Sequence, residues 1–124
     1  MLSLAVYKTI HFLGVFTMVT ALVASLARSA QADGAGAAAT PDPWRKRLAL
    51  AHGGALFLIL LGGFGMLARL GVGITGWVAA KLAIWVVAGG LIALRKHPRA
   101  AAWGVALVPL LAALAGWIGY TKPF

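Results

Sequence analysis

Apolar residues along this 124-residue chain fall into four long runs, each bracketed by polar or charged positions. The runs span residues 8–28, 47–69, 75–95 and 99–122, and no Asp or Glu lies between their bracketing residues. A bilayer hydrocarbon core of about 30 Å requires about 20 helical residues at about 1.5 Å each, so every run is long enough to cross it. The pattern predicts an all-α integral membrane protein, an antiparallel four-helix bundle that forms a single transmembrane domain over residues 1–124.

The connections between the runs are short, apart from one. Residues 29–46 contain Gly, Pro and both acidic residues, Asp33 and Asp42. Such a segment buries too little apolar surface to hold a structure of its own. We therefore expect a surface loop between the first two spans.

Composition agrees with a membrane environment and excludes most soluble classes. Hydrophobic residues make up 62% of the chain, the mean hydropathy is +0.94, and only 10% of residues are charged. The net charge of +9 would suggest a nucleic-acid partner in a soluble protein. Here the cations lie at the ends of apolar runs, which is typical of basic loops facing an anionic lipid leaflet, so the expected partner is the bilayer and not nucleic acid.

The distribution of basic residues predicts the direction of the spans. Seven Lys and Arg lie near span ends on the side that carries residues 29–46 and the third loop: Arg28, Arg45, Lys46, Arg47, Arg95, Lys96 and Arg99. The opposite side has three: Lys8, Arg69 and Lys122. Since Lys and Arg concentrate in cytoplasmic loops, residues 29–46 are expected in the cytoplasm and both termini outside it, in what we expect to be a bacterial inner membrane.

Residue types also limit the chemistry and suggest how the spans pack. The chain has no cysteine, which excludes disulfides, thiolate metal sites and cysteine nucleophiles. Membrane helices associate through close backbone approach at small residues. Candidate contacts are two small pairs in the last run and a glycine cluster in the second: Ala112 with Gly116, Ala115 with Gly119, and Gly62, Gly63 and Gly65.

Three ionisable side chains lie inside the apolar runs: His11, His52 and Lys81. Because placing an ionisable group inside a membrane costs free energy, such residues are candidates for function. Counting from the bracketing charges, His11 is expected about 5 Å and Lys81 about 9 Å inside the outer boundary, at one common level. His52 is expected about 7 to 8 Å inside the opposite boundary, roughly 18 Å in depth from His11. One haem iron cannot bind both histidines of a chain at that separation.

Each candidate has a simpler alternative, and these stay open. His52 lies near a basic helix end, where a histidine is commonly a satisfied interfacial group. The Lys81 stem is nearly long enough to bring its amine to the membrane surface.

The residues resemble a known family over the first three runs. The histidine in Lys8-Thr9-Ile10-His11, the pair Arg47-Leu48, and Gly76-Trp77 followed by Lys81-Leu82 are similar to the HemJ-type protoporphyrinogen oxidases and to the wider group of CopD-like and SirB-like small four-helix membrane proteins. The resemblance implies an association with haem b and essential roles for His11 and Lys81, with His11 as the metal ligand.

Two functions follow as competing hypotheses, and whether the protein is an enzyme is left open. One is a haem- or porphyrin-binding, redox-linked protein that uses His11 and Lys81 as catalytic residues, with His11 or His52 binding the cofactor. The other is a structural or assembly subunit that contacts other membrane subunits or further copies of itself. A carrier is disfavoured because the spans contain no carboxylate and no matched pair of broken helices.

The common level of His11 and Lys81 predicts a polar pocket between the first and third runs. Helical spacing predicts which residues share a face with each of them: Tyr7 and Gly14 with His11, and Trp77 and Ala88 with Lys81.

Overall fold

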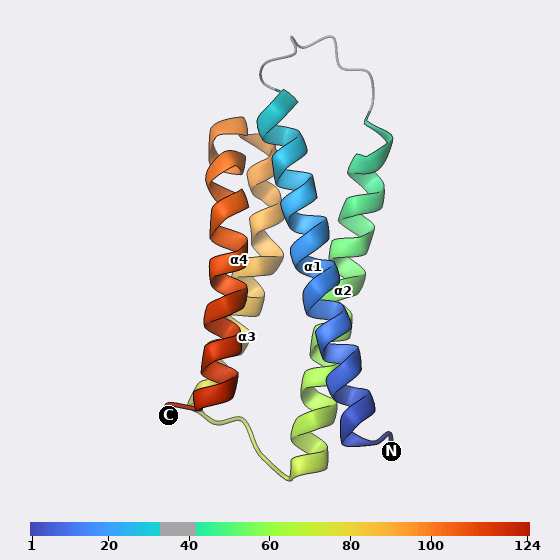
Figure 1. The fold of residues 1–124 in the computed structure, drawn as a ribbon, viewed down its shortest axis with the longest axis vertical. Coiled ribbons are helices and arrows are strands. Elements are labelled where there is room, and N and C mark those ends of the chain that lie inside the picture. The colour runs from blue at the N-terminus through green and yellow to red at the C-terminus, as the bar shows by residue number, and fades with distance from the viewer. Residues whose placement is uncertain (33–41) are drawn as a thin grey trace.

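The computed structural model describes residues 1–32 and 42–124, and within these ranges the fold is all-α, as the sequence predicts (Figure 1). The elements in order are α1 (Leu4–Ala32), α2 (Pro43–Leu70), α3 (Gly76–Gly90), the 3-10 helix η1 (Leu91–Lys96), which directly continues α3, and α4 (Pro98–Thr121). The helical ends of the expected loop 29–46 belong to α1 and α2, and its central residues 33–41 lie outside the described residues.

Local chemistry sets where the helices begin and end. Asp42 caps α2 by accepting a hydrogen bond from the Trp44 amide at 3.0 Å, and Pro43 occupies the first turn, where its missing N–H costs nothing. Gly71 ends α2 in the left-handed conformation at φ 64°, which glycine adopts without strain. Pro98 begins α4 in the same way as Pro43 begins α2.

All four helical segments are long and apolar enough to cross a membrane, taking α3 and η1 together as one segment of 21 residues. Their lengths are 29, 28, 21 and 24 residues, and an 18-residue window of each has a mean hydropathy between 1.8 and 2.0. Large apolar side chains such as Phe16, Phe57 and Leu110 are mostly exposed, as expected where the surrounding solvent is lipid. The chain is therefore described as a small four-span membrane protein.

The helices run antiparallel, and α1 crosses the bundle obliquely (Figure 1). The termini and the connection between α2 and α3 lie at one end, here called the termini end. The start of α2 and the junction of η1 with α4 lie at the opposite end, called the loop end. Towards the termini end α1 packs on α2, and towards the loop end it lies against α4 and η1. The pair of α1 and α2 and the pair of α3 and α4 separate towards the termini end.

The apolar core occupies the middle of the bundle and the half towards the loop end. Leu22 and Leu26 of α1 are completely buried, and the remaining core residues come from all four helices: Met18, Ala55, Ala88, Ala101 and Val108. Leu26 lies directly against Gly104 of α4, where an added Cβ would meet its Cδ1 at 2.7 Å.

Glycines bring α1 and α2 into backbone contact in the half towards the termini end. An added Cβ at Gly62 would lie 2.5 Å from the His11 backbone nitrogen, and one at Gly14 would lie 2.8 Å from that of Ile59. The prediction of close packing at the second-span glycines is thus confirmed at Gly62. It is wrong at Gly116, where an added Cβ would meet nothing within 4 Å, because that position faces away from the other helices.

Candidate functional site

His11 lies on the face of α1 that packs against α2. Its Nδ1 is 2.8 Å from the Ile59 carbonyl oxygen, and the ring lies beside Gly63, where an added Cβ would be 3.5 Å from Nδ1, an ordinary van der Waals distance. Tyr7 and Gly14 share this face, as helical spacing predicts. The structure places this face against α2, where Gly62 allows a close approach of the two backbones, whereas the sequence suggested a direction between the first and third spans.

The hydrogen bond to Ile59 fixes how the His11 ring can act. A carbonyl oxygen only accepts, so Nδ1 carries the proton and donates it. In the neutral imidazole the lone pair is then on Nε2. Histidines that bind metals commonly donate their other ring N–H to a backbone carbonyl in this way, which orients the ring and raises the basicity of the ligating nitrogen.

Lys81 projects from α3 towards α4 and is half-buried. Its Nζ would lie 2.8 Å from a Cβ added at Gly119, so the amine occupies the space that this glycine leaves free. Of its predicted neighbours, Ala88 belongs to the core, and the Trp77 ring lies 5.6 Å from the Lys122 amine. His11 and Lys81 pack in different helix pairs, His11 against Gly62 of α2 and Lys81 against Gly119 of α4. A pocket shared by the two side chains stays a prediction.

His52 lies at a different interface, between α2 and α3. It is 3% exposed, its Nε2 is 3.4 Å from the Gly89 carbonyl oxygen, and its buried Nδ1 has no hydrogen-bond partner among the described residues. Four residues away on each helix, the Trp85 indole donates to the Leu56 carbonyl at 3.0 Å. The two contacts form a reciprocal clasp, which is defined here by His52, Leu56, Trp85 and Gly89.

The two buried histidines are separated along α2. His11 contacts Ile59, seven residues beyond His52, which is about 10 Å along the helix axis. This is less than the depth of about 18 Å expected from the charge brackets. The packing of His11 against Ile59 and Gly62 sets its level on α2, and α1 begins at Leu4, ahead of the Lys8 bracket from which the depth was counted. Since an imidazole binds a metal at about 2 Å, a single ion between the two rings does not fit this spacing.

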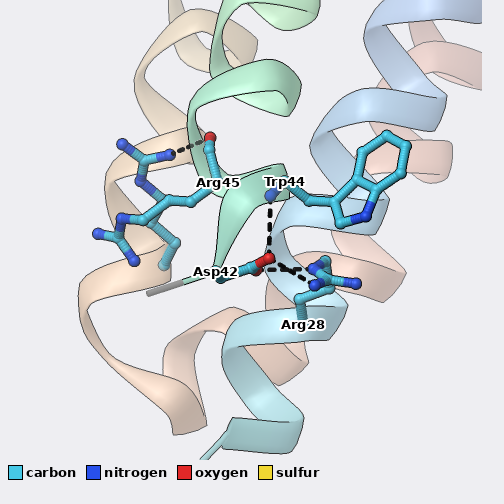
Figure 2. A network of polar contacts seen from close by, with 5 residues as sticks. Arg28, Asp42, Trp44 and Arg45 are labelled. Atoms are coloured by element: carbon cyan, nitrogen blue, oxygen red, sulfur yellow. Dashed lines mark hydrogen bonds and ion pairs between the residues drawn. The ribbon is translucent and has the colours of Figure 1, made fainter. Parts of the chain in front are cut away.

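A polar network joins the helices at the loop end (Figure 2). Arg28 of α1 forms an ion pair with Asp42 through two hydrogen bonds of 2.8 and 2.6 Å. The Arg28 bonds are the largest cause that lowers the pKa of the Asp42 carboxyl, and the Trp44 amide and the charges of Arg28 and Arg45 add to it. In the sequence Arg28 indicated only the orientation of the spans and Asp42 only a loop, because their pairing across the connection between α1 and α2 depends on the fold.

Arg95 connects three elements in the same network. Its Nη1 donates to the Arg45 carbonyl on α2 at 3.4 Å, and its own carbonyl accepts a hydrogen bond from the Ser29 hydroxyl at the end of α1. Neither contact was predicted from the sequence, because no sequence pattern indicates that a residue of a 3-10 helix contacts a helix end more than 40 positions away.

Among residues 1–32 and 42–124, no group of three or more His, Cys, Asp or Glu side chains is positioned to hold a metal ion. Comparisons with family models, curated proteins and solved structures gave no match to the chain. The fold and the polar contacts therefore define the class, a four-span all-α membrane protein.

Proposed function

We propose that this protein binds haem b or a related porphyrin, that Nε2 of His11 would hold its iron, and that its role is redox-linked. The observation that carries the proposal is the 2.8 Å contact between His11 Nδ1 and the Ile59 carbonyl. It holds the ring in the tautomer that leaves Nε2 able to bind iron.

The resemblance to HemJ-type proteins supports the same residue from the sequence. When bound, haem would supply one-electron redox chemistry. The protein would supply the ligand and its orientation. Lys81, whose amine lies beside Gly119 in the neighbouring helix pair, would provide a cation for a propionate group.

His52 is not part of this proposed site. Its Nε2 is directed to the Gly89 carbonyl, and its position along α2 is about 10 Å from the His11 contact. We therefore expect the two histidines to act independently, with His52 serving the contact between α2 and α3.

The test is the absorption spectrum of the purified protein, taken as isolated and after titration with haemin. We expect a Soret band that His11→Ala abolishes, while His52→Ala and the loop variant His97→Ala retain it. Thermal unfolding of each variant in the same detergent confirms that it is folded. Absence of a Soret band from the folded wild-type protein even after haemin titration would refute the proposal, as would equal loss in His11→Ala and His52→Ala.

The alternative, a structural or assembly subunit, is favoured by one specific observation. A groove of about 330 Å³ lies on the bundle surface between α1 and α2, and two threonines contribute hydroxyls to its otherwise apolar lining: Phe16, Thr17, Thr20, Ala21, Leu48 and Ala51. Hydroxyl groups beside small residues support contacts between membrane helices. Under this alternative, a transmembrane helix of another subunit occupies the groove, and Ala21→Leu abolishes its co-purification while His11→Ala does not.

A further inference from the structure

The loop end carries an excess of positive charge in the described part of the chain. Seven Lys and Arg lie there, and Asp42 is the single carboxylate at this end among the described residues. Asp42 is engaged by both hydrogen bonds from Arg28. Arg47 lies over the Trp44 ring, with its guanidinium carbon 5.4 Å from the ring centre. These two cations therefore already have partners.

Arg45 and Arg95 form a different arrangement on the other side of the start of α2. The Arg45 carbonyl accepts from Arg95, and the Arg45 side chain extends on the side from which that bond comes (Figure 2). Arg95 uses one of its five N–H donors in this contact, so most of its donors remain for another acceptor. The Arg95 guanidinium, bonded to the Arg45 backbone, and the Arg45 side chain thus belong to one junction of α2 and η1.

The fold holds this junction in place before any ligand arrives. The Ser29 hydroxyl fixes the Arg95 carbonyl to α1, and the Arg95 guanidinium is fixed to α2. The repulsion between like charges in a medium of reduced dielectric falls when an anion lies between them. A planar guanidinium matches the oxygens of a phosphate with two parallel hydrogen bonds.

The position of the junction relative to the membrane surface indicates which kind of phosphate compound it would bind. Trp44 and Trp103 are 49% and 80% exposed near the loop end, as expected of tryptophans at the headgroup level of a membrane. Phosphates of membrane phospholipids lie at this level, and basic sites between helices on the cytoplasmic side bind anionic headgroups.

We propose that Arg45 and Arg95 form a binding site for the phosphate of an anionic phospholipid at the junction of α2 and η1. This site is independent of His11 and of any cofactor.

The experiment measures binding of phosphatidylglycerol to the purified full-length protein by native mass spectrometry, with phosphatidylcholine as the reference lipid. It is done at about 0.5 M salt, which screens diffuse attraction but leaves hydrogen-bonded pairs. We expect Arg45→Gln and Arg95→Gln each to weaken phosphatidylglycerol binding by about fivefold or more, which is the effect of losing one close cation. Arg99→Gln is the matched control, because it removes the same charge from the same end on α4, and it should change binding less than about twofold.

Arg45→Gln is the decisive variant, because the fold uses the Arg45 carbonyl, which glutamine keeps. Its thermal stability in phosphatidylcholine should equal that of the wild type. Equal losses in all three variants would show diffuse attraction without a site, and equal binding of the two lipids would remove the site altogether. Stabilisation by about 10 mM inorganic phosphate in phosphatidylcholine alone would contradict a lipid ligand and indicate a soluble anion.

Discussion

The two halves of this bundle hold α1 by different means. Towards the loop end, Leu22 and Leu26 are buried among side chains of the other helices, and an apolar core fills the space between them. Towards the termini end, Gly14 and Gly62 bring the α1 and α2 backbones into direct contact. The first half should be sensitive to the removal of atoms and the second to their addition.

This difference also places the polar candidates. His11 lies in the half where α1 packs on α2 and not in the shared core, and Lys81 lies in the separate pair of α3 and α4. Regions with few shared apolar contacts are the ones that open and rearrange most readily. We therefore expect the half towards the termini end to open more readily than the half towards the loop end.

The largest predicted effect comes from adding one methyl group to the glycine contact. In Gly62→Ala the new Cβ would lie 2.5 Å from the His11 nitrogen and 2.7 Å from the Tyr7 carbonyl oxygen, so the two backbones must separate. We expect a loss of about 3 kcal/mol in the free energy of unfolding, measured by reversible denaturation in mixed micelles. Gly54→Ala is the control, because an added Cβ there meets nothing within 4 Å. Similar stability of the two variants would mean that backbone contact does not hold this half together.

The next effect comes from removing atoms from the core. Leu22→Ala takes away most of a completely buried side chain. Lipid is as apolar as the core, so the loss comes from packing and the cavity, and we expect about 2 kcal/mol, at the low end for such a change. Leu110→Ala, at a position 67% exposed, should have little effect in the same assay. If Leu110→Ala is equally destabilising, the described core is not the stabilising region.

A smaller effect is expected at the clasp between α2 and α3. Trp85→Phe removes the donor to the Leu56 carbonyl and keeps an aromatic ring. Hydrogen bonds between membrane helices contribute about 0.6 kcal/mol on average, so the loss should be of that order. Trp117→Phe, at a position 56% exposed on α4, serves as the comparison. A loss in Trp117→Phe as large as that in Trp85→Phe would argue against the hydrogen bond as the cause.

The smallest effect is expected at the ion pair of the loop end, and it depends on pH. The Arg28 hydrogen bonds lower the pKa of Asp42 below 3.8, so the contribution of the pair is complete above that value and is lost as the pH falls through the lowered pKa. Asp42→Asn should therefore be slightly less stable than the wild type at pH 7, and the difference should vanish at strongly acidic pH. Thermal unfolding at the two pH values measures it. A difference that persists at acidic pH would assign it to the cap of α2 instead.

The sequence was sufficient to predict the fold, because a hydrophobic run of membrane length has few stable structures other than a membrane-spanning helix. The same pattern could not place the His11 face, since periodicity shows which residues share a face but not which helix that face meets. Gly62 of the second run carried the missing information, because the absence of a side chain there allows the α1 and α2 backbones to approach closely. The contact between Lys81 and Gly119 has the same origin, because a small residue on one helix accommodates a long one on another.

The clasp of His52, Leu56, Trp85 and Gly89 has a consequence for the register of α2 and α3, which make few other backbone contacts. On each helix one member of the clasp supplies a ring N–H and the other, one turn away, supplies a carbonyl oxygen. A shift of α3 by a single residue would turn it by about 100° and move it by about 1.5 Å, which breaks both bonds together. The two hydrogen bonds thus specify one alignment of α2 and α3, whereas packing between apolar surfaces alone would be compatible with many alignments.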